Sequence, residues 1–255
     1  MNYEDYKKID YKKSNDNKKE NIIETIPKII KISYYYMLFN IYSLIFLINS
    51  IFDNKSSYSD IIRYVYKYVF QSKIKIKTER RLDNNADVYL CNHSTCADFI
   101  IDPIITNGAC GISRKLVFIA FLFPSLYALI HNKIKYISIN TYSFGVVLRK
   151  CIQEKQKFFF YPEGGRNPYK KKMLLRKGGL QEVFNNNLSV QIIISYNKEK
   201  IFNEFTYEVN KEVVVYVYYS ELIKSTDYNN FDDFFNKVND VWYYYYRLEN
   251  NNLIK

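Results

Sequence analysis

The stretch DVYLCNHSTCADF, residues 87–99, decides the fold class predicted for this chain. Its first five residues form a short apolar run, which predicts a buried strand, and the polar residues after it predict a turn into a helix. The turn contains His93, one of two histidines in 255 residues, and Asp98 follows five positions later. A histidine in such a turn is either structural or chemical, and this stretch alone leaves both interpretations open.

His93 and Asp98 can meet only if the helix begins between them. On a regular helix, at about 100° per residue, side chains five positions apart diverge by roughly 140°. With His93 in the turn and Asp98 in the first helical turns, the carboxylate can bind one imidazole nitrogen. That contact fixes the tautomer and leaves the other nitrogen as a base for an alcohol proton. The pair alone is weak evidence, because H-x4-D also occurs by chance.

A second stretch, FFFYPEGGRNP at residues 158–168, has the same arrangement of strand and loop. Its apolar run predicts a buried strand that ends in the loop EGGR, residues 163–166. Glycines let a backbone approach a ligand closely, and the arginine fork suits a phosphate. The stretch KKKMLLRKGGL at 170–180 adds cations close to this loop. Taken alone, such a loop is more often a turn with solvated charges.

Together, the two stretches resemble the glycerophospholipid acyltransferase family, the 1-acylglycerol-3-phosphate (lysophosphatidate) acyltransferases. Asn-His-x4-Asp follows a predicted strand, and Phe-x-Pro-Glu-Gly-x-Arg comes roughly seventy residues later. The segment LLRKGGL, which contains Lys177 and Gly178, is similar to the family's lysine-glycine segment. The resemblance is good over about residues 85–195 and holds elsewhere by general layout, including a hydrophobic N-terminal helix.

The resemblance implies transfer of a fatty acyl group from a thioester donor, acyl-CoA or acyl carrier protein. The acceptor would be a hydroxyl of a lysophospholipid or glycerol phosphate, with 1-acylglycerol-3-phosphate expected first. His93 would be the general base, and Asp98 would orient it and stabilise the imidazolium. The residues implied in binding the acceptor's polar head are Glu163, Gly164, Gly165, Arg166 and Lys177. The chemistry requires no bound cofactor, metal ion or covalent acyl-enzyme.

One part of the family pattern is altered in this chain. The family often has Gly-x-x-Phe-Ile-Asp-Arg between the two motifs, and the aligned stretch here is YISINTYS, residues 136–143. Asn140 and Thr141 stand where the acid and the arginine would be. A phosphate ligand is therefore lost or replaced, and the candidate replacements are Arg114, Lys133 and Lys135. The alteration bears on phosphatidate synthesis and leaves acyl transfer in general intact.

The N-terminal part predicts contact with a membrane. The uncharged stretch ISYYYMLFNIYSLIFLINSIF, residues 32–52, is long enough to cross a bilayer core of roughly 30 Å as a helix. Its tyrosines also suit a helix lying in the interface, and a buried core helix is a further alternative. We expect a disordered polar segment at 1–25, a membrane-anchoring helix at 26–55 and an α/β acyltransferase domain at 56–255.

Strands and helices alternate through the third segment, which predicts an α/β fold: a layered mixed sheet flanked by helices. The predicted strands lie at 73–77 (an edge strand), 87–91, 133–139, 157–162, 189–196 and 211–219. Helices are expected after the first motif, at 143–155 and at 231–245. In the last of these, Phe234, Val238 and Trp242 belong to an apolar stripe that would pack on the core.

The composition narrows the class of partner. The net charge is +11 and the pI about 9.2, which favours nucleic acid, an acidic membrane surface or a phosphate-bearing substrate. The chain has no recognisable nucleic-acid-binding module, and nucleic-acid binding explains neither motif. A lipid-binding protein that keeps the fold without turnover is the other alternative. The intact His93 and Asp98 argue against it.

The cysteines indicate a reducing compartment. Cys91, Cys96, Cys110 and Cys151 form no C-x-x-C pair, and the chain starts with no secretory signal. Their spacing matches no common zinc site. We therefore expect a membrane protein whose active site faces a cytosol-like compartment, with no metal centre.

Overall fold

The computed structural model describes residues 22–52, 58–114, 117–118, 121–137, 142–167 and 173–248. The disorder expected at 1–25 lies outside these ranges for residues 1–21, whereas residues 22–25 belong to a helix. The altered motif positions Asn140 and Thr141 also lie outside the described residues. The predicted 26–55 helix corresponds to α2, which begins somewhat earlier, at Ile22, and ends at Phe52.

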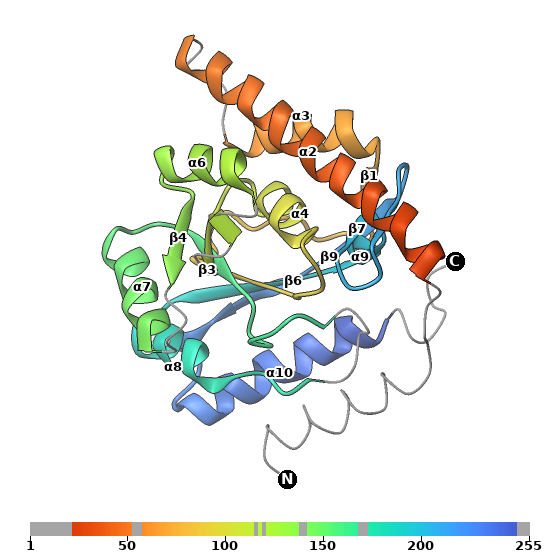
Figure 1. Ribbon diagram of the computed structural model, residues 1–255. Helices are drawn as coiled ribbons and strands as arrows, with labels where there is room; N and C mark the ends of the chain where they lie inside the picture. Colours follow the sequence, from red (N-terminus) through yellow and green to blue (C-terminus); the bar gives the residue numbers. More distant parts are fainter. Residues whose placement is uncertain are drawn as a thin grey trace.

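The centre of the described structure is a seven-stranded mixed sheet in the order β1-β9-β6-β2-β5-β3-β4 (Figure 1). Its strands are β1 (Lys73–Ile76), β2 (Val88–Cys91), β3 (Cys110–Arg114), β4 (Ile134–Ile137), β5 (Phe158–Phe160), β6 (Ser189–Tyr196) and β9 (Val214–Lys224). From β6 to β4 all neighbours are parallel, whereas β9 runs antiparallel to β6 and carries β1 at the edge. A separate short hairpin is formed by β7 (Phe202–Asn203) and β8 (Glu208–Val209). The layered α/β class is therefore confirmed.

Helices cover both faces of this sheet (Figure 1). One face carries α2 with α3 (Tyr58–Phe70), α4 (Asp98–Ile105) and α6 (Leu122–Ile130). The other face carries α7 (Tyr142–Gln153), α8 (Lys177–Asn185) and α10 (Phe231–Arg247). The remaining helical segments are α9 (Lys198–Ile201) and the short 3-10 turn Ser225–Asp227. This is a three-layer arrangement with a core on each side of the sheet.

The central strand β2 explains why its sequence is a continuous apolar run. Tyr89 and Cys91 are buried in the core beneath α4, and Val88 and Leu90 in the core beneath α8 and α10. Successive side chains of a strand point to opposite faces, so a strand covered on both sides needs apolar residues throughout.

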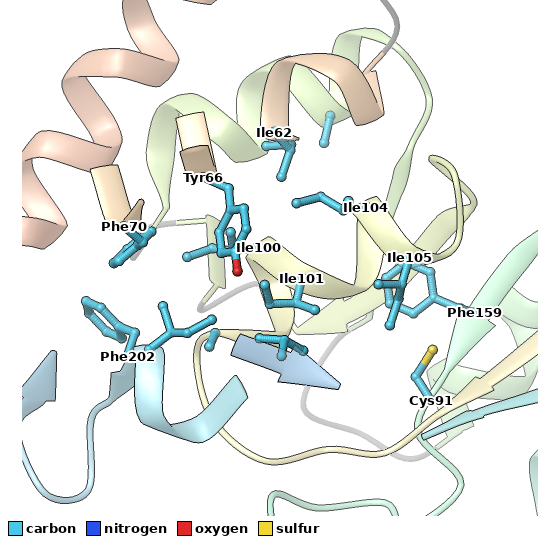
Figure 2. Packing of buried hydrophobic residues seen from close by; sticks show 14 of the residues in the cluster. Ile62, Tyr66, Phe70, Cys91, Ile100, Ile101, Ile104, Ile105, Phe159 and Phe202 are labelled. Carbon is cyan, nitrogen blue, oxygen red and sulfur yellow. The ribbon is translucent and has the colours of Figure 1, made fainter. Parts of the chain in front are cut away.

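Helix α4 lies between the sheet and α3 (Figure 2). Ile62 of α3 lies over Ile104, while Ile105 lies beside Phe159 of β5 (Figure 2). Seven of the eight α4 residues are buried, including both of its aspartates. Carboxylates at such positions require partners, because an isolated buried charge is very costly.

Helix α2 has one face on the protein and one face exposed. Its inner face contributes Phe39, which packs edge-on against Phe121, and Tyr35, which stacks on Phe70. The exposed apolar side chains along the opposite face are Ile26, Ile29, Ile30, Tyr34, Met37, Ile41, Ile45 and Ile48. By length and composition alone, Glu24–Asn49 could cross a membrane.

Candidate active site

Three neighbouring parallel strands, β6, β2 and β5, end at the same edge of the sheet. His93 lies just after β2, Tyr161 directly follows β5, and Lys198 opens α9 just after β6. Parallel strands bring the loops at their carboxyl ends together, which is where ligands bind in open α/β sheets. The loops after β2 and β5 contain the two sequence motifs.

His93 and Asp98 are in direct contact, with Nδ1 2.5 Å from a carboxylate oxygen of Asp98. Asp98 is the first residue of α4, so the helix begins between the two residues, as the predicted contact required. The same oxygen accepts the backbone N–H of Ser94 at 2.7 Å, which fixes the carboxylate. An ionised Asp98 accepts a hydrogen bond from Nδ1–H, which leaves Nε2 as the basic nitrogen. Within the described residues, no side chain hydrogen-bonds Nε2.

The surroundings of His93 favour its neutral form. Its ring stacks on Tyr161, with centroids 4.1 Å apart and planes 9° from parallel. Burial lowers the pKa of His93 below its ordinary value, and the adjacent Asp98 carboxylate opposes part of that effect. The side chain is nevertheless 24% exposed. A neutral, partly accessible imidazole is the state that a general base requires.

Lys198 forms a buried ion cluster with two aspartates of α4. Its ammonium is fully buried and lies 2.9 Å from Asp98 and 3.1 Å from Asp102. It also donates to the backbone carbonyl of Asn92 at 2.5 Å, and Asp102 accepts the Tyr161 hydroxyl at 2.8 Å. Asp98 and Asp102 are four positions apart, so both carboxylates project from one face of α4 toward the lysine.

The cluster shifts the pKa values of its members. Burial raises the pKa of Asp102, and the adjacent Lys198 ammonium opposes this effect. Burial alone would raise the pKa of Asp98 as well, but Lys198 and His93 hold it below its ordinary value. Burial alone would lower the pKa of Lys198, whereas the carboxylates of Asp102 and Asp98 raise it. Asp98 is thus ionised where it contacts His93.

Lys198 and Asp102 were not predicted to be site residues, because Lys198 belongs to neither motif and Asp102 lies beyond the H-x4-D pattern. The local signal was D-x3-D on a short apolar helix, together with a lysine after the apolar run of β6. A lysine so close to a buried strand needs an anionic partner if it folds inward. Finding that partner requires knowing that β6 lies beside β2.

The loop after β5 is fastened to the backbone of His93. The Glu163 carboxylate is buried and accepts the His93 backbone N–H at 2.5 Å, and the backbone N–H of Asn167 donates to the His93 carbonyl at 2.7 Å. Burial raises the pKa of Glu163 to about 8, with the His93 N–H opposing. Glu163 therefore joins the two motif loops and points away from solvent.

Gly164 has a backbone conformation that favours glycine. Its φ is +70°, and a Cβ at this position would collide with the side chain of Arg176. The backbone N–H of Arg176 donates to the carbonyl of Pro162 at 2.8 Å. Arg176 consequently lies over the loop that contains Gly164 and Gly165.

Arg166 lies at the rim of the site, with its side chain 40% exposed. It forms an ion pair with Glu204 in the turn between β7 and β8. The other Glu204 oxygen accepts the backbone N–H of Cys96 at 2.9 Å, and the Arg166 guanidinium lies over the Phe205 ring, 5.3 Å from its centroid. The β7–β8 hairpin thus contacts both motif loops.

Lys177 lies elsewhere. It begins α8 on the opposite face of the sheet from α4 (Figure 1). Its ammonium is 3.0 Å from Asp232 and lies over the rings of Phe231 and Phe235, all from α10. The structure therefore brings together His93, Asp98, Glu163, Gly164, Gly165 and Arg166, and it directs Lys177 toward α10.

The three cations considered as replacements for the altered middle motif differ in position. Lys133 precedes β4 at its amino end, the edge of the parallel strands opposite the site, and Lys135 pairs with Glu154 at 2.7 Å. Arg114 is the last residue of β3, so its backbone lies at the carboxyl edge. Of the three residues, only Arg114 has its backbone at the carboxyl edge of the sheet, where the site lies.

The cysteines of the described chain are all free thiols. Burial raises the pKa of Cys91 and of Cys96, although Arg166 partly opposes the effect at Cys96. Thiols with raised pKa values are poor nucleophiles. Across the described ranges, no three His, Cys, Asp or Glu side chains are grouped so that they could hold a metal ion.

The fold is similar to that in the crystal structure of the 1-acyl-sn-glycerophosphate (LPA) acyltransferase, PlsC, from Thermotoga maritima. The TM-score is 0.69, and the similar region covers 88% of this chain and 97% of that one at 12% sequence identity. No protein-family model matches the sequence. No curated protein sequence matches it either. The structural likeness shows a shared fold.

Proposed function

We propose that this chain is an O-acyltransferase that moves a fatty acyl group from a thioester donor to a hydroxyl of a lysophospholipid. The observation that carries the proposal is the His93–Asp98 contact, joined through Glu163 to the loop that contains Arg166. In support of the proposal, an imidazole and a guanidinium lie on neighbouring loops at the carboxyl edge of the sheet. The fold shared with an LPA acyltransferase supports the same activity.

The geometry supports a direct transfer. Nε2 of His93 takes the proton of the acceptor hydroxyl, and the acceptor oxygen forms a bond to the thioester carbonyl carbon. The carbon–sulfur bond then breaks, and the leaving thiolate takes the proton from the imidazolium. Asp98 stabilises the imidazolium while it exists. The products are an ester and a free thiol. The proposed donors are acyl-CoA and acyl carrier protein.

The acceptor's polar head would bind at the loop after β5. Arg166 would contact its phosphate, the backbone of Gly164 and Gly165 would approach it, and Glu163 would hold the loop in place. Arg176 lies over this loop and is a more direct candidate than Lys177, whose predicted role stays a prediction. We propose 1-acylglycerol-3-phosphate as the first acceptor, with Arg114 replacing the missing middle-motif arginine.

Membrane association is proposed through α2. A helix that packs one face on the protein and exposes an apolar stripe along the other suits the interface of a bilayer. A spanning helix would instead expose apolar side chains all round. Lipid along α2 would bring the two apolar substrates to the protein, and the thiols suit a reducing compartment.

The test is acyl transfer by membranes containing the full chain, with labelled oleoyl-CoA or oleoyl-acyl carrier protein as donor. The acceptors are glycerol 3-phosphate and lysophospholipids with different head groups, and products are identified by mass. One acylated product that is absent with His93→Ala supports the proposal and names the acceptor. Lipid binding by folded protein without product from any pair would favour the binding-protein alternative.

A further inference from the structure

We propose that Lys198 and Asp102 are positioning residues that set the charge state of the His93–Asp98 base. Neither residue belongs to the two sequence motifs. The catalytic meaning of the inference rests on the proposed function, while its effect on the histidine is measurable without any substrate.

Lys198 contacts both the carboxylate that orients His93 and the backbone of the turn that carries His93. Its ammonium contacts the Asp98 oxygen that does not face His93, at 2.9 Å, so the carboxylate is held between a lysine and an imidazole. It also donates to the carbonyl of Asn92, the residue before His93. The Asn92 side chain in turn bonds the backbone of Ser195 at 2.8 and 3.0 Å. The turn that carries His93 is thereby tied to β6.

Asp102 balances the charge that Lys198 introduces. Without the lysine, two fully buried carboxylates on one helix face would repel each other, and a protonated His93 would be the nearest cation left to balance them. Without Asp102, the lysine would place an additional uncompensated positive charge beside the base. Tyr161 donates to Asp102 and stacks on His93, which links the second aspartate to the imidazole from the other side.

The charged and titratable groups facing His93 come from every element around it. They are Asp98 from α4, Lys198 from α9, Arg166, Tyr161 and the Glu163 carboxyl from the segment after β5, the last through the His93 backbone. Lys198 and Arg166 disfavour a charged imidazole, and Asp98 favours it. The Asp102 carboxylate lies 3.1 Å from the Lys198 ammonium and offsets its charge. Removing Lys198 and removing Asp102 must therefore move the proton affinity of His93 in opposite directions.

The experiment is an NMR titration of the full chain in detergent micelles, with histidine labelled in the ring. Only His93 and His131 give signals, because the chain has two histidines. His131→Gln assigns the two signals. We compare the wild type with Lys198→Met and Asp102→Asn, and with Lys237→Met as a control that removes a surface lysine paired with Glu221.

The expected result is opposite shifts. Lys198→Met raises the pH at which His93 titrates, Asp102→Asn lowers it, and Lys237→Met leaves it unchanged. In the double variant, His93 titrates at a pH between those of the two single variants. If Lys198→Met alone does not fold, the double variant replaces it in the comparison, because it removes the lysine and an aspartate charge together. Shifts in the same direction, or none in folded protein, would overturn the inference.

Kinetics separates this inference from the proposed function. If the chain transfers acyl groups, Lys198→Met lowers kcat by about 10- to 100-fold, as removing a partner that orients a functional side chain does, and leaves the acceptor KM unchanged. The acid limb of its pH profile moves upward and that of Asp102→Asn moves downward. Opposite NMR shifts in a protein that forms no ester would uphold the charge coupling and refute the acyltransferase.

Discussion

The carboxylate of Glu204 is paired with the guanidinium of Arg166, so the cation predicted to bind an acceptor phosphate already has an anionic partner. Glu204 also accepts the backbone N–H of Cys96, which keeps its carboxylate between the two motif loops. A bound phosphate would compete with this carboxylate for the same guanidinium. The hairpin between β7 and β8 therefore bears directly on which head group the site accepts.

Glu204→Gln should lower the KM for an anionic lysophospholipid by about threefold, because a partly exposed ion pair is worth up to ~1 kcal/mol. The kcat should stay the same, since Glu204 contacts no reacting group. Initial rates with lysophosphatidate at varied concentration test this. Glu208→Gln on the same hairpin is the matched control. A raised KM in Glu204→Gln would mean that the carboxylate positions Arg166 for substrate instead of competing with it.

Glu163 should make the folded state less stable as the pH rises. Its pKa is raised to about 8, so the folded protein keeps a proton that the unfolded chain releases near pH 4. Stability from this group is complete below that pH and is lost progressively up to about pH 8.

Glu163→Gln should therefore reduce the loss of stability between pH 5 and pH 8 by about 1–3 kcal/mol, since the amide cannot ionise. The free energy of unfolding from urea titrations at several pH values measures it. An unchanged pH dependence in folded Glu163→Gln would show that this carboxyl is already ionised in the folded protein at neutral pH.

Gly164→Ala should damage the loop that carries Arg166. Alanine is strained at a φ of +70°, and its Cβ would displace Arg176. We expect a loss of about 1–3 kcal/mol in the free energy of unfolding and a marked loss of acyl transfer. Gly178→Ala is the matched control, because its Cβ meets nothing within 4 Å and a helix favours alanine. Equal effects of the two substitutions would contradict the account of this loop.

The exposed stripe of α2 should mediate binding to vesicles. Ile30→Glu with Ile41→Glu places two charges on the stripe without touching the inner face, and should weaken binding to anionic phospholipid vesicles at least about tenfold. Flotation with the vesicles measures it. Val146→Glu, an exposed valine on α7 across the sheet, controls for added charge. Equal binding by wild type and the double variant would exclude α2 as the contact surface.

Local sequence predicted the central contact because its cause is local. The apolar run of β2, the polar turn and the onset of α4 lie within 87–99, and this order alone lets His93 and Asp98 meet. The strand at 189–196 has the predicted bounds, and its sequence SVQIIISY is rich in the β-branched residues that favour strands. By contrast, β3 has the sequence CGISR, which carries neither alternation nor an apolar run, and it was missed.

The remainder of the site depends on contacts between distant parts of the chain. Lys198 meets Asp98 because β6 pairs with β2, and Glu204 meets Arg166 because a hairpin inserted before β9 folds over the motif loops. Lys177 was expected in the site because the segment LLRKGGL resembles the lysine-glycine segment of the acyltransferase family. The start of α8 instead points it toward α10, a direction set by packing beneath the sheet.

The most direct test of the central claim is acceptor-dependent acyl transfer by wild type, His93→Ala and Cys96→Ser, assayed side by side with the same donor and acceptor. We predict that Cys96→Ser makes ester at a rate close to that of the wild type, and that folded His93→Ala makes no more than the background. Ester formation by His93→Ala at the wild-type rate would contradict the account. Loss of activity in Cys96→Ser, together with an acylated Cys96 in the wild type, would also contradict it, because the reaction would then proceed through a cysteine nucleophile.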